Sequence, residues 1–294
     1  MTNTTDFLAA AIALILTAAV QFAAMADEHP APSRHTYKTV GDRELTVDVF
    51  EPTGKAPSGG RPAIVFFHGG GWVFGKPADY HAACRRYAEK GLVVLAFEYR
   101  LSIKEDGSYP HPDITPVEST LDARSAMRWL RANATKFGVD PDRIAVAGRS
   151  AGGQLAMATV LLDKLNEKSD DLSVDPAANL LILYSSNFNT LEQWVDRILA
   201  KRRNEIWSIS PHHNLKAGVP PTIAFHGTED DTVPYWVVLH FRKKTTRLGN
   251  DFTLVPIEGK KHLLGEEDGP YGVYLTEDVL KRTDEFLEKH GYLD

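Results

Sequence analysis

Two kinds of hydrophobic pattern divide the chain. Residues 37–40 and 45–50 alternate apolar and polar positions around Gly41 and Asp42, which is typical of an antiparallel hairpin at a sheet edge. Beyond Pro62 the apolar runs are continuous, and they cover residues 63–67, 92–97, 144–147, 180–184, 222–225 and 252–257. Continuous runs indicate strands buried on both faces, and helical stretches separate them. The pattern therefore predicts an α/β domain with a mostly parallel sheet and helices on both faces.

The domain organisation follows from the same pattern. No repeat, low-complexity tract or linker interrupts it, so residues 36–294 are predicted to form a single domain. Residues 27–35 are polar and contain prolines, which indicates a flexible leader. Residues 7–24 carry no charge, and Ala24 and Ala26 then flank Met25. This arrangement is typical of a secretory signal peptide spanning residues 1–26, with cleavage after Ala26.

Export would make the mature protein secreted or periplasmic, with no stable membrane association. The alternative is an uncleaved anchor, because residues 1–6 contain no Lys or Arg. Residues 7–24 are, however, barely long enough to span a bilayer and are rich in Ala and Thr.

Composition bears on the partners and metal ions that the protein is expected to bind. The 33 Lys and Arg residues against 39 Asp and Glu give a formal charge of −6, so no basic surface for nucleic acid is expected. The single cysteine, Cys84, has no internal disulfide partner and is predicted to be a small buried residue. His212 and His213 lack ligand spacing to a carboxylate, so no metal site is predicted. No oligomeric state is indicated.

The pentapeptide GRSAG at residues 148–152 carries the strongest chemical signal. It stands between the strand-like run 144–147 and a helix-forming run, 154–162. A sharp strand-to-helix turn strains its central residue, and Gly148 and Gly152 remove the Cβ atoms that would clash. Ser150 is thereby predicted to be a nucleophile. The helix N-terminus, beginning with Ala151, presents free N–H groups that suit an oxyanion.

A glycine loop, HGGGW at residues 68–72, directly follows the run 63–67. By itself such a loop can be a plain tight turn. Acyl transfer, however, needs donors aimed at the developing oxyanion. Beside a nucleophile we therefore predict that Gly70 and Gly71 form the oxyanion hole with Ala151.

An acid and a base follow two further strand-like runs. HGTEDDTVP occupies residues 226–234 and GKKH residues 259–262, so His262 can act as general base. The acid that orients it is open among Glu229, Asp230 and Asp231. The chain order of serine, acid and histidine is one that catalytic triads use. Because each motif follows a strand, all are expected at one sheet edge.

The motifs HGGGW, GRSAGG, HGTEDDTVP and GKKH, with FEYRL at 97–101 and FGVDPDRI at 137–144, together resemble a known family. The chain is similar, over residues 36–293, to the α/β-hydrolase carboxylesterases. It resembles the hormone-sensitive-lipase-like group and, more closely, the acetyl-xylan and feruloyl esterase-like group. The resemblance implies the α/β-hydrolase fold and serine ester hydrolysis without a cofactor. It also implies Asp230 as the acid, four residues after the histidine of HGxxD.

Two departures from the family pattern bear on the substrate. Arg149 stands where many relatives have Asp, Gly or Gln, and LLGEED at residues 263–268 replaces small and aromatic residues after His262. Carboxylates in this run near the pocket mouth would favour neutral short-acyl esters, and the alternative is a solvated turn. Trp72, Arg149 and Trp207 are predicted to line the pocket, with a core position as the alternative for Trp72.

The expected function is hydrolysis of short-acyl carboxylic esters, either small molecules or acetyl and feruloyl groups linked to a polysaccharide. A peptidase or formamidase would use the same triad on an amide. A non-catalytic binding module is a further alternative, but such modules usually lose a triad residue and this chain keeps all of them.

Overall fold

The computed structural model describes residues 31–191 and 193–294. Contacts divide the chain into the units Met1–Pro32 and Ser33–Asp294, and all the described helices and strands belong to the second. The predicted signal peptide, residues 1–26, and the first residues of the predicted leader lie outside the described residues.

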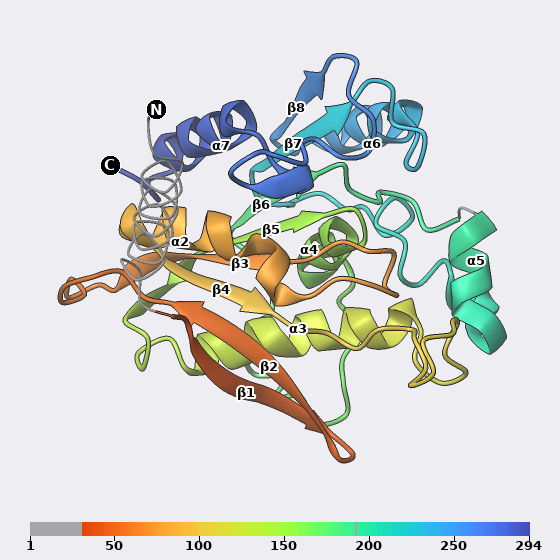
Figure 1. Ribbon diagram of the computed structural model, residues 1–294, viewed down its shortest axis with the longest axis horizontal. Helices are drawn as coiled ribbons and strands as arrows, with labels where there is room; N and C mark the ends of the chain where they lie inside the picture. The colour runs from red at the N-terminus through yellow and green to blue at the C-terminus, as the bar shows by residue number, and fades with distance from the viewer. Residues whose placement is uncertain (1–30, 192) are drawn as a thin grey trace, which may run out of the picture. The chain divides into compact units, whose positions relative to one another are not determined.

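An eight-stranded sheet forms the centre of the second unit, in the order β1-β2-β4-β3-β5-β6-β7-β8 (Figure 1). The strands are β1 Ser33–Val40, β2 Arg43–Phe50, β3 Arg61–Phe67, β4 Val93–Phe97, β5 Val139–Arg149, β6 Leu180–Tyr184, β7 Thr222–Gly227 and β8 Phe252–Ile257. The β1–β2 and β2–β4 pairs are antiparallel, and the other pairs are parallel. The predicted mostly parallel sheet with an antiparallel N-terminal hairpin, the α/β-hydrolase arrangement, is confirmed.

The first strand begins earlier than the sequence predicts. Ser33 and His35 pair with Val49 and Val47 of β2, and the Arg34 Nε donates to the Asp48 Oδ1 at 2.7 Å. Residues 33–35, assigned to the flexible leader, are therefore strand, and that boundary was wrong. The polar composition of these residues reflects their exposed position on an edge strand.

Helices cover both faces of the sheet. They are α2 His81–Glu89, α3 Pro116–Ala132, α4 Ala151–Leu161, α5 Gln193–Leu199, α6 Tyr235–Arg247 and α7 Glu277–Lys289, with the 3-10 turns η1 Pro77–Tyr80, η2 Ala200–Glu205 and η3 Gly272–Tyr274. Within the described ranges, none of these helices has the length and apolarity that crossing a membrane requires.

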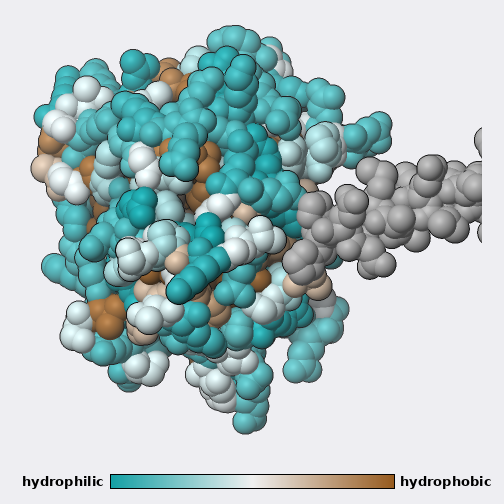
Figure 2. Space-filling view, turned by 90° about the vertical axis from the view of Figure 1, so that its left-hand side faces the viewer, coloured by the Kyte–Doolittle hydropathy of each residue, from teal (hydrophilic) through white to brown (hydrophobic). Residues whose placement is uncertain are grey.

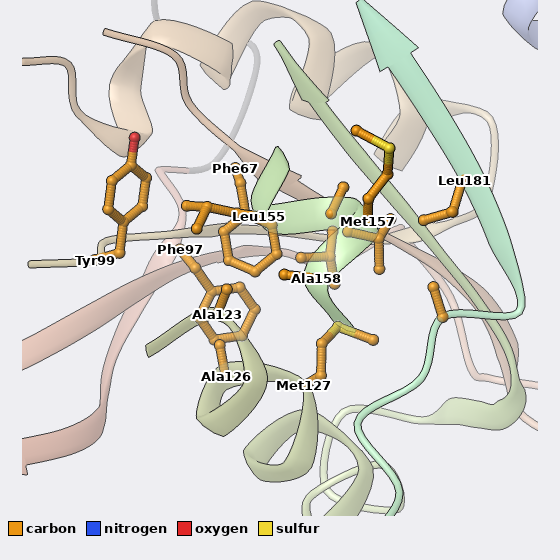
Figure 3. Packing of buried hydrophobic residues seen from close by; sticks show 14 of the residues in the cluster. Phe67, Phe97, Tyr99, Ala123, Ala126, Met127, Leu155, Met157, Ala158 and Leu181 are labelled. Carbon is orange, nitrogen blue, oxygen red and sulfur yellow. The ribbon is translucent and has the colours of Figure 1, made fainter. Parts of the chain in front are cut away.

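The core lies in two layers, one on each side of the sheet. On one side, Phe67 and Phe97 pack with Leu155 of α4 and Met127 of α3 (Figure 3). On the other side, side chains of α2 and α7 pack on the sheet, and Cys84 is fully buried there as predicted. Burial on both sides explains the continuous apolar runs. Outside the core, the face in Figure 2 is mostly hydrophilic, with only small separated apolar areas.

A buried charge network ties the hairpin to the segment after β4. The carboxylate of Asp122 on α3 is fully buried and accepts hydrogen bonds from Arg100 Nε at 2.7 Å and from Lys38 Nζ at 2.7 Å. Glu167 binds the same two cations at 3.0 and 3.1 Å. These contacts join β1, α3 and the chain leaving β4, and every charge in the group has a partner.

We predict that Asp122→Asn lowers the free energy of unfolding by about 3 kcal/mol, because it leaves two buried cations short of a counter-charge. Urea unfolding followed by circular dichroism measures the change. The control is Asp278→Asn, which removes an exposed ion pair with Arg282 and should have little effect. Equal losses in the two variants would contradict a structural role for the network.

Candidate active site

Ser150 occupies a strained turn between β5 and α4. Its φ is +53° and its ψ is −118°, a backbone conformation that side chains rarely adopt. A Cβ at Gly152 would lie 2.0 Å from the Phe67 carbonyl oxygen, and one at Gly148 would lie 2.2 Å from the Gly152 oxygen. Both glycines are thus required by close backbone contacts. The Ser150 N–H donates to the Tyr184 carbonyl at 3.0 Å and holds the turn in place.

The glycine loop faces the same cavity as Ser150. Gly70 and Gly71 both have positive φ, +108° and +62°. The Gly70 carbonyl accepts hydrogen bonds from Val73 N at 3.1 Å and Phe74 N at 2.9 Å, so it points away into the loop. Ala151 is the first residue of α4, and the N–H of such a residue has no acceptor within its own helix.

His68 braces this loop from behind. Its Nδ1 lies 2.8 Å from the Gly69 carbonyl oxygen, and its ring stacks on Tyr99 with centroids 4.2 Å apart. The Tyr99 hydroxyl in turn donates to the His68 carbonyl at 2.8 Å. Burial lowers the pKa of His68 to about 4, so the ring is neutral near pH 7 and donates through Nδ1. The loop therefore has a rigid support.

Asp230 and His262 are in direct contact. The His262 Nδ1 lies 2.9 and 3.1 Å from the two carboxylate oxygens of Asp230, whose side chain is fully buried. Oδ1 also accepts from the backbone N–H groups of Thr232 and Val233, each at 2.9 Å. His226 Nε2 lies 3.2 Å from Oδ2 and 2.8 Å from the Val233 carbonyl. His226 thus shapes the acid loop.

These hydrogen bonds determine the charge on Asp230. Burial alone would favour its neutral form, but the hydrogen bonds from His226 and His262, with the charge of His262, outweigh burial. The pKa of Asp230 therefore lies far below its usual range. The two other acids that the sequence left open are exposed, and Asp231 binds Lys261 at 3.2 Å.

A cavity of about 370 Å³ brings these groups together. It is lined by Gly70, Gly71, Arg149, Ser150, Asp231, Thr232 and His262. The lining comes from loops that follow β3, β5, β7 and β8, at the carboxyl ends of parallel strands. Among the described residues, no group of three or more His, Cys, Asp or Glu side chains is arranged to hold a metal ion.

Two of the predicted pocket residues lie elsewhere. Trp72 is fully buried in the core, where its Nε1 donates to the Gln154 Oε1 at 3.1 Å. Its φ of +60° is a conformation that the sequence does not reveal. Trp207 is 55% exposed and packs edge-on against His213. Its carbonyl accepts from Asn214 Nδ2 in a surface turn, and Trp207 is not among the residues that line the cavity. Arg149 lines the cavity.

The acidic run after His262 also differs from its expected role. Glu266, Glu267 and Asp268 are all exposed, and none of them lines the cavity. The Glu266 carboxylate binds Lys260 at 3.2 Å. This run is a solvated turn, the alternative reading of the sequence.

Gln154 is a residue that sequence reasoning missed. It is fully buried on α4, and besides the Trp72 contact its Nε2 donates to the Ile209 carbonyl at 2.9 Å. It therefore ties the glycine loop and the segment after η2 to the helix that carries Ser150. Its signal was a polar amide in a helix whose other side chains, apart from Thr159, are apolar.

Comparison with known proteins agrees with this geometry. A probable isoprenylcysteine alpha-carbonyl methylesterase from Arabidopsis thaliana is 27% identical over 74% of this chain and 48% of its own length. The chain thus spans about half the length of that curated relative. Esterase 2 of Thermogutta terrifontis, in a structure with bound propionate, is 35% identical over 92% of this chain and 98% of its own, with a TM-score of 0.79.

A second structure of the same Thermogutta terrifontis esterase, phosphorylated by paraoxon, is 33% identical over 90% of this chain and 96% of its own, with a TM-score of 0.79. The BD-FAE family model matches residues 47–244, which is more than half of the chain. The chain therefore belongs to the BD-FAE family, among the α/β-hydrolase carboxylesterases.

Proposed function

We propose that this protein hydrolyses carboxylic esters with Ser150 as nucleophile, His262 as general base and Asp230 as the residue that orients the base. The hydrogen bond between His262 Nδ1 and the buried Asp230 carboxylate carries the proposal. It leaves Nε2 as the acceptor nitrogen of the ring. The cavity that His262 lines is also lined by Ser150. Asp230 stays ionised throughout the physiological range, so it stabilises the imidazolium when His262 takes up a proton.

In the acylation step, Ser150 Oγ attacks the ester carbonyl carbon as its proton moves to His262 Nε2. The carbonyl oxygen becomes an oxyanion, which the backbone N–H groups of Ala151, Gly70 and Gly71 stabilise. Collapse of this intermediate breaks the bond to the alcohol oxygen, and the imidazolium gives that oxygen its proton. Water then attacks the acyl-enzyme through His262, releasing the acid and restoring the Ser150 hydroxyl.

We further propose short acyl groups, with acetyl or feruloyl groups on a carbohydrate as the natural form. A cavity of about 370 Å³ lies at the small end of the range for ligand pockets. The relative from Thermogutta terrifontis was solved with propionate and with butyrate. The similarity of the motifs to acetyl-xylan and feruloyl esterases supports the carbohydrate part.

We predict hydrolysis of 4-nitrophenyl acetate and butyrate at a higher kcat/KM than the decanoate. Steady-state kinetics on these esters, on acetylated xylan, on a feruloyl ester and on an anilide measures this preference. Faster cleavage of the anilide than of the esters would indicate an amidase.

Ser150→Ala and His262→Ala should each lower kcat by roughly 10⁴-fold or more, because the two residues act in one step. For the same reason, kcat of the double variant should be hardly lower than kcat of either single variant. Steady-state kinetics measures these values. If the fold-losses of the two single variants multiply in the double variant, the residues do not share a mechanism.

The assignment of the acid is tested separately. Asp230→Asn should lower kcat by at least roughly a hundredfold, because the amide favours the wrong tautomer of His262. Asp231→Asn, a neighbouring variant with the same loss of charge, should cost less than tenfold, since Asp231 is exposed and binds Lys261. A reversed order would move the assignment to Asp231.

We also propose export with cleavage after Ala26, on the basis of the uncharged run at residues 7–24 and the small residues that follow it. Expression of the full chain in a bacterial host should yield a soluble form whose intact mass equals that of residues 27–294. A full-length mass recovered in the membrane fraction would indicate the anchored alternative.

A further inference from the structure

Arg149 is a buried cation without an anionic partner. It is 6% exposed, and its guanidinium carbon lies 4.3 Å from the centre of the Tyr274 ring. Its Nε is buried without a hydrogen-bond partner. Within residues 31–191 and 193–294, no carboxylate forms an ion pair with it and no oxygen accepts a hydrogen bond from it. Nevertheless the side chain lines the cavity that contains Ser150 and His262.

The other buried arginines in the described part of the chain are satisfied. Arg100 binds Asp122, and Arg128 binds Asp170 at 3.0 Å. Arg124 donates to the carbonyls of Ala158 and Thr159, at 2.9 and 3.1 Å. A buried charge is normally paired because its desolvation costs several kcal/mol. Arg149 departs from this rule at the position where a substrate would bind.

The surroundings of the guanidinium do not supply the missing charge. Tyr274 presents the face of its ring to the guanidinium. That face attracts a cation but carries no negative charge and accepts no hydrogen bond from the guanidinium N–H groups. A Cβ at Gly69 would lie 2.7 Å from Nη2, so the loop packs directly against the guanidinium. His68 in the same loop is neutral near pH 7. Asp231, the exposed acid in the lining, is bound to Lys261.

We propose that Arg149 binds an anionic group of the substrate, so that the preferred esters carry a carboxylate in addition to the scissile bond. This inference rests on the proposed ester hydrolysis. A planar guanidinium matches a carboxylate with paired hydrogen bonds, and the Tyr274 ring packed against it restricts its position. Because Arg149 directly precedes Ser150, the carboxylate would lie close to the reacting ester. The carboxylates at 266–268, which near the pocket mouth would favour neutral esters, are exposed and do not line the cavity, so they do not oppose an anionic substrate.

Matched substrate pairs test the proposal. In the first pair, 4-acetoxybenzoate and its methyl ester place the charge on the alcohol part, and release of the phenol is measured. In the second pair, the 4-nitrophenyl half-ester of adipic acid and its methyl ester place the charge on the acyl part. We expect the wild type to prefer the anionic member of at least one pair by tenfold or more in kcat/KM, mainly through KM.

Arg149→Gln should reduce that preference at least tenfold, mainly by raising KM for the anionic partner. Arg149→Lys keeps the charge but loses the planar fork, so it should retain part of the preference. Arg242→Gln, the same substitution at an exposed position on α6, is the control and should leave the preference unchanged.

A measurement on the wild type alone tests the proposal even if an Arg149 variant fails to fold. 4-Hydroxybenzoate should inhibit at least tenfold more strongly than 4-hydroxybenzamide, and added salt should narrow the gap. Equal kcat/KM for the anionic and neutral esters, together with equal inhibition by 4-hydroxybenzoate and 4-hydroxybenzamide, would contradict the role of Arg149. It would not contradict ester hydrolysis. Failure to cleave either member of either pair would instead contradict the proposed function.

Discussion

The close approach of α4 to the end of β3 controls where the proposed nucleophile lies. At Gly152 the two backbones are so near that a single added carbon would lie 2.0 Å from the Phe67 carbonyl. Gly153 meets Ser186 in the same way, with 1.8 Å between an added Cβ and Oγ. Because the Phe67 carbonyl belongs to the last residue of β3, it cannot move without disturbing the sheet, and Ser150 is held at φ +53°. Stability of the surrounding core maintains that strain.

The same edge of the sheet then determines the charges around Ser150. In the loop after β7, Asp230 is buried and accepts hydrogen bonds from the backbone N–H groups of Thr232 and Val233. The loop after β8 places His262 in contact with its carboxylate. The outcome is a carboxylate that stays ionised next to the proposed base. In the glycine loop, burial keeps His68 neutral. Arg149, which packs against the same loop, is a cation without a counter-charge. Reaction type and substrate charge thus depend on different residues of one cavity.

Sequence patterns predicted the parts of this arrangement that have a local cause. Continuous apolar runs located the parallel strands, and the motifs after them placed Ser150, Asp230 and His262 at one edge. Contacts between distant segments were not predictable in this way. Trp72 turns into the core because its φ is +60° and Gln154 accepts its N–H. Arg149 stacks on Tyr274, and no local pattern links those two positions. Strand β1 started early because pairing with β2 overrides its polar composition.

The activation of Ser150 through His262 is tested most directly by covalent labelling of the wild-type protein with paraoxon, followed by intact mass measurement and peptide mapping. We expect one diethylphosphoryl group per molecule, located on Ser150, and much slower labelling in His262→Ala because the serine then lacks its base. Labelling at another residue, or an equal rate in His262→Ala, would contradict the claim that Ser150 is activated through His262.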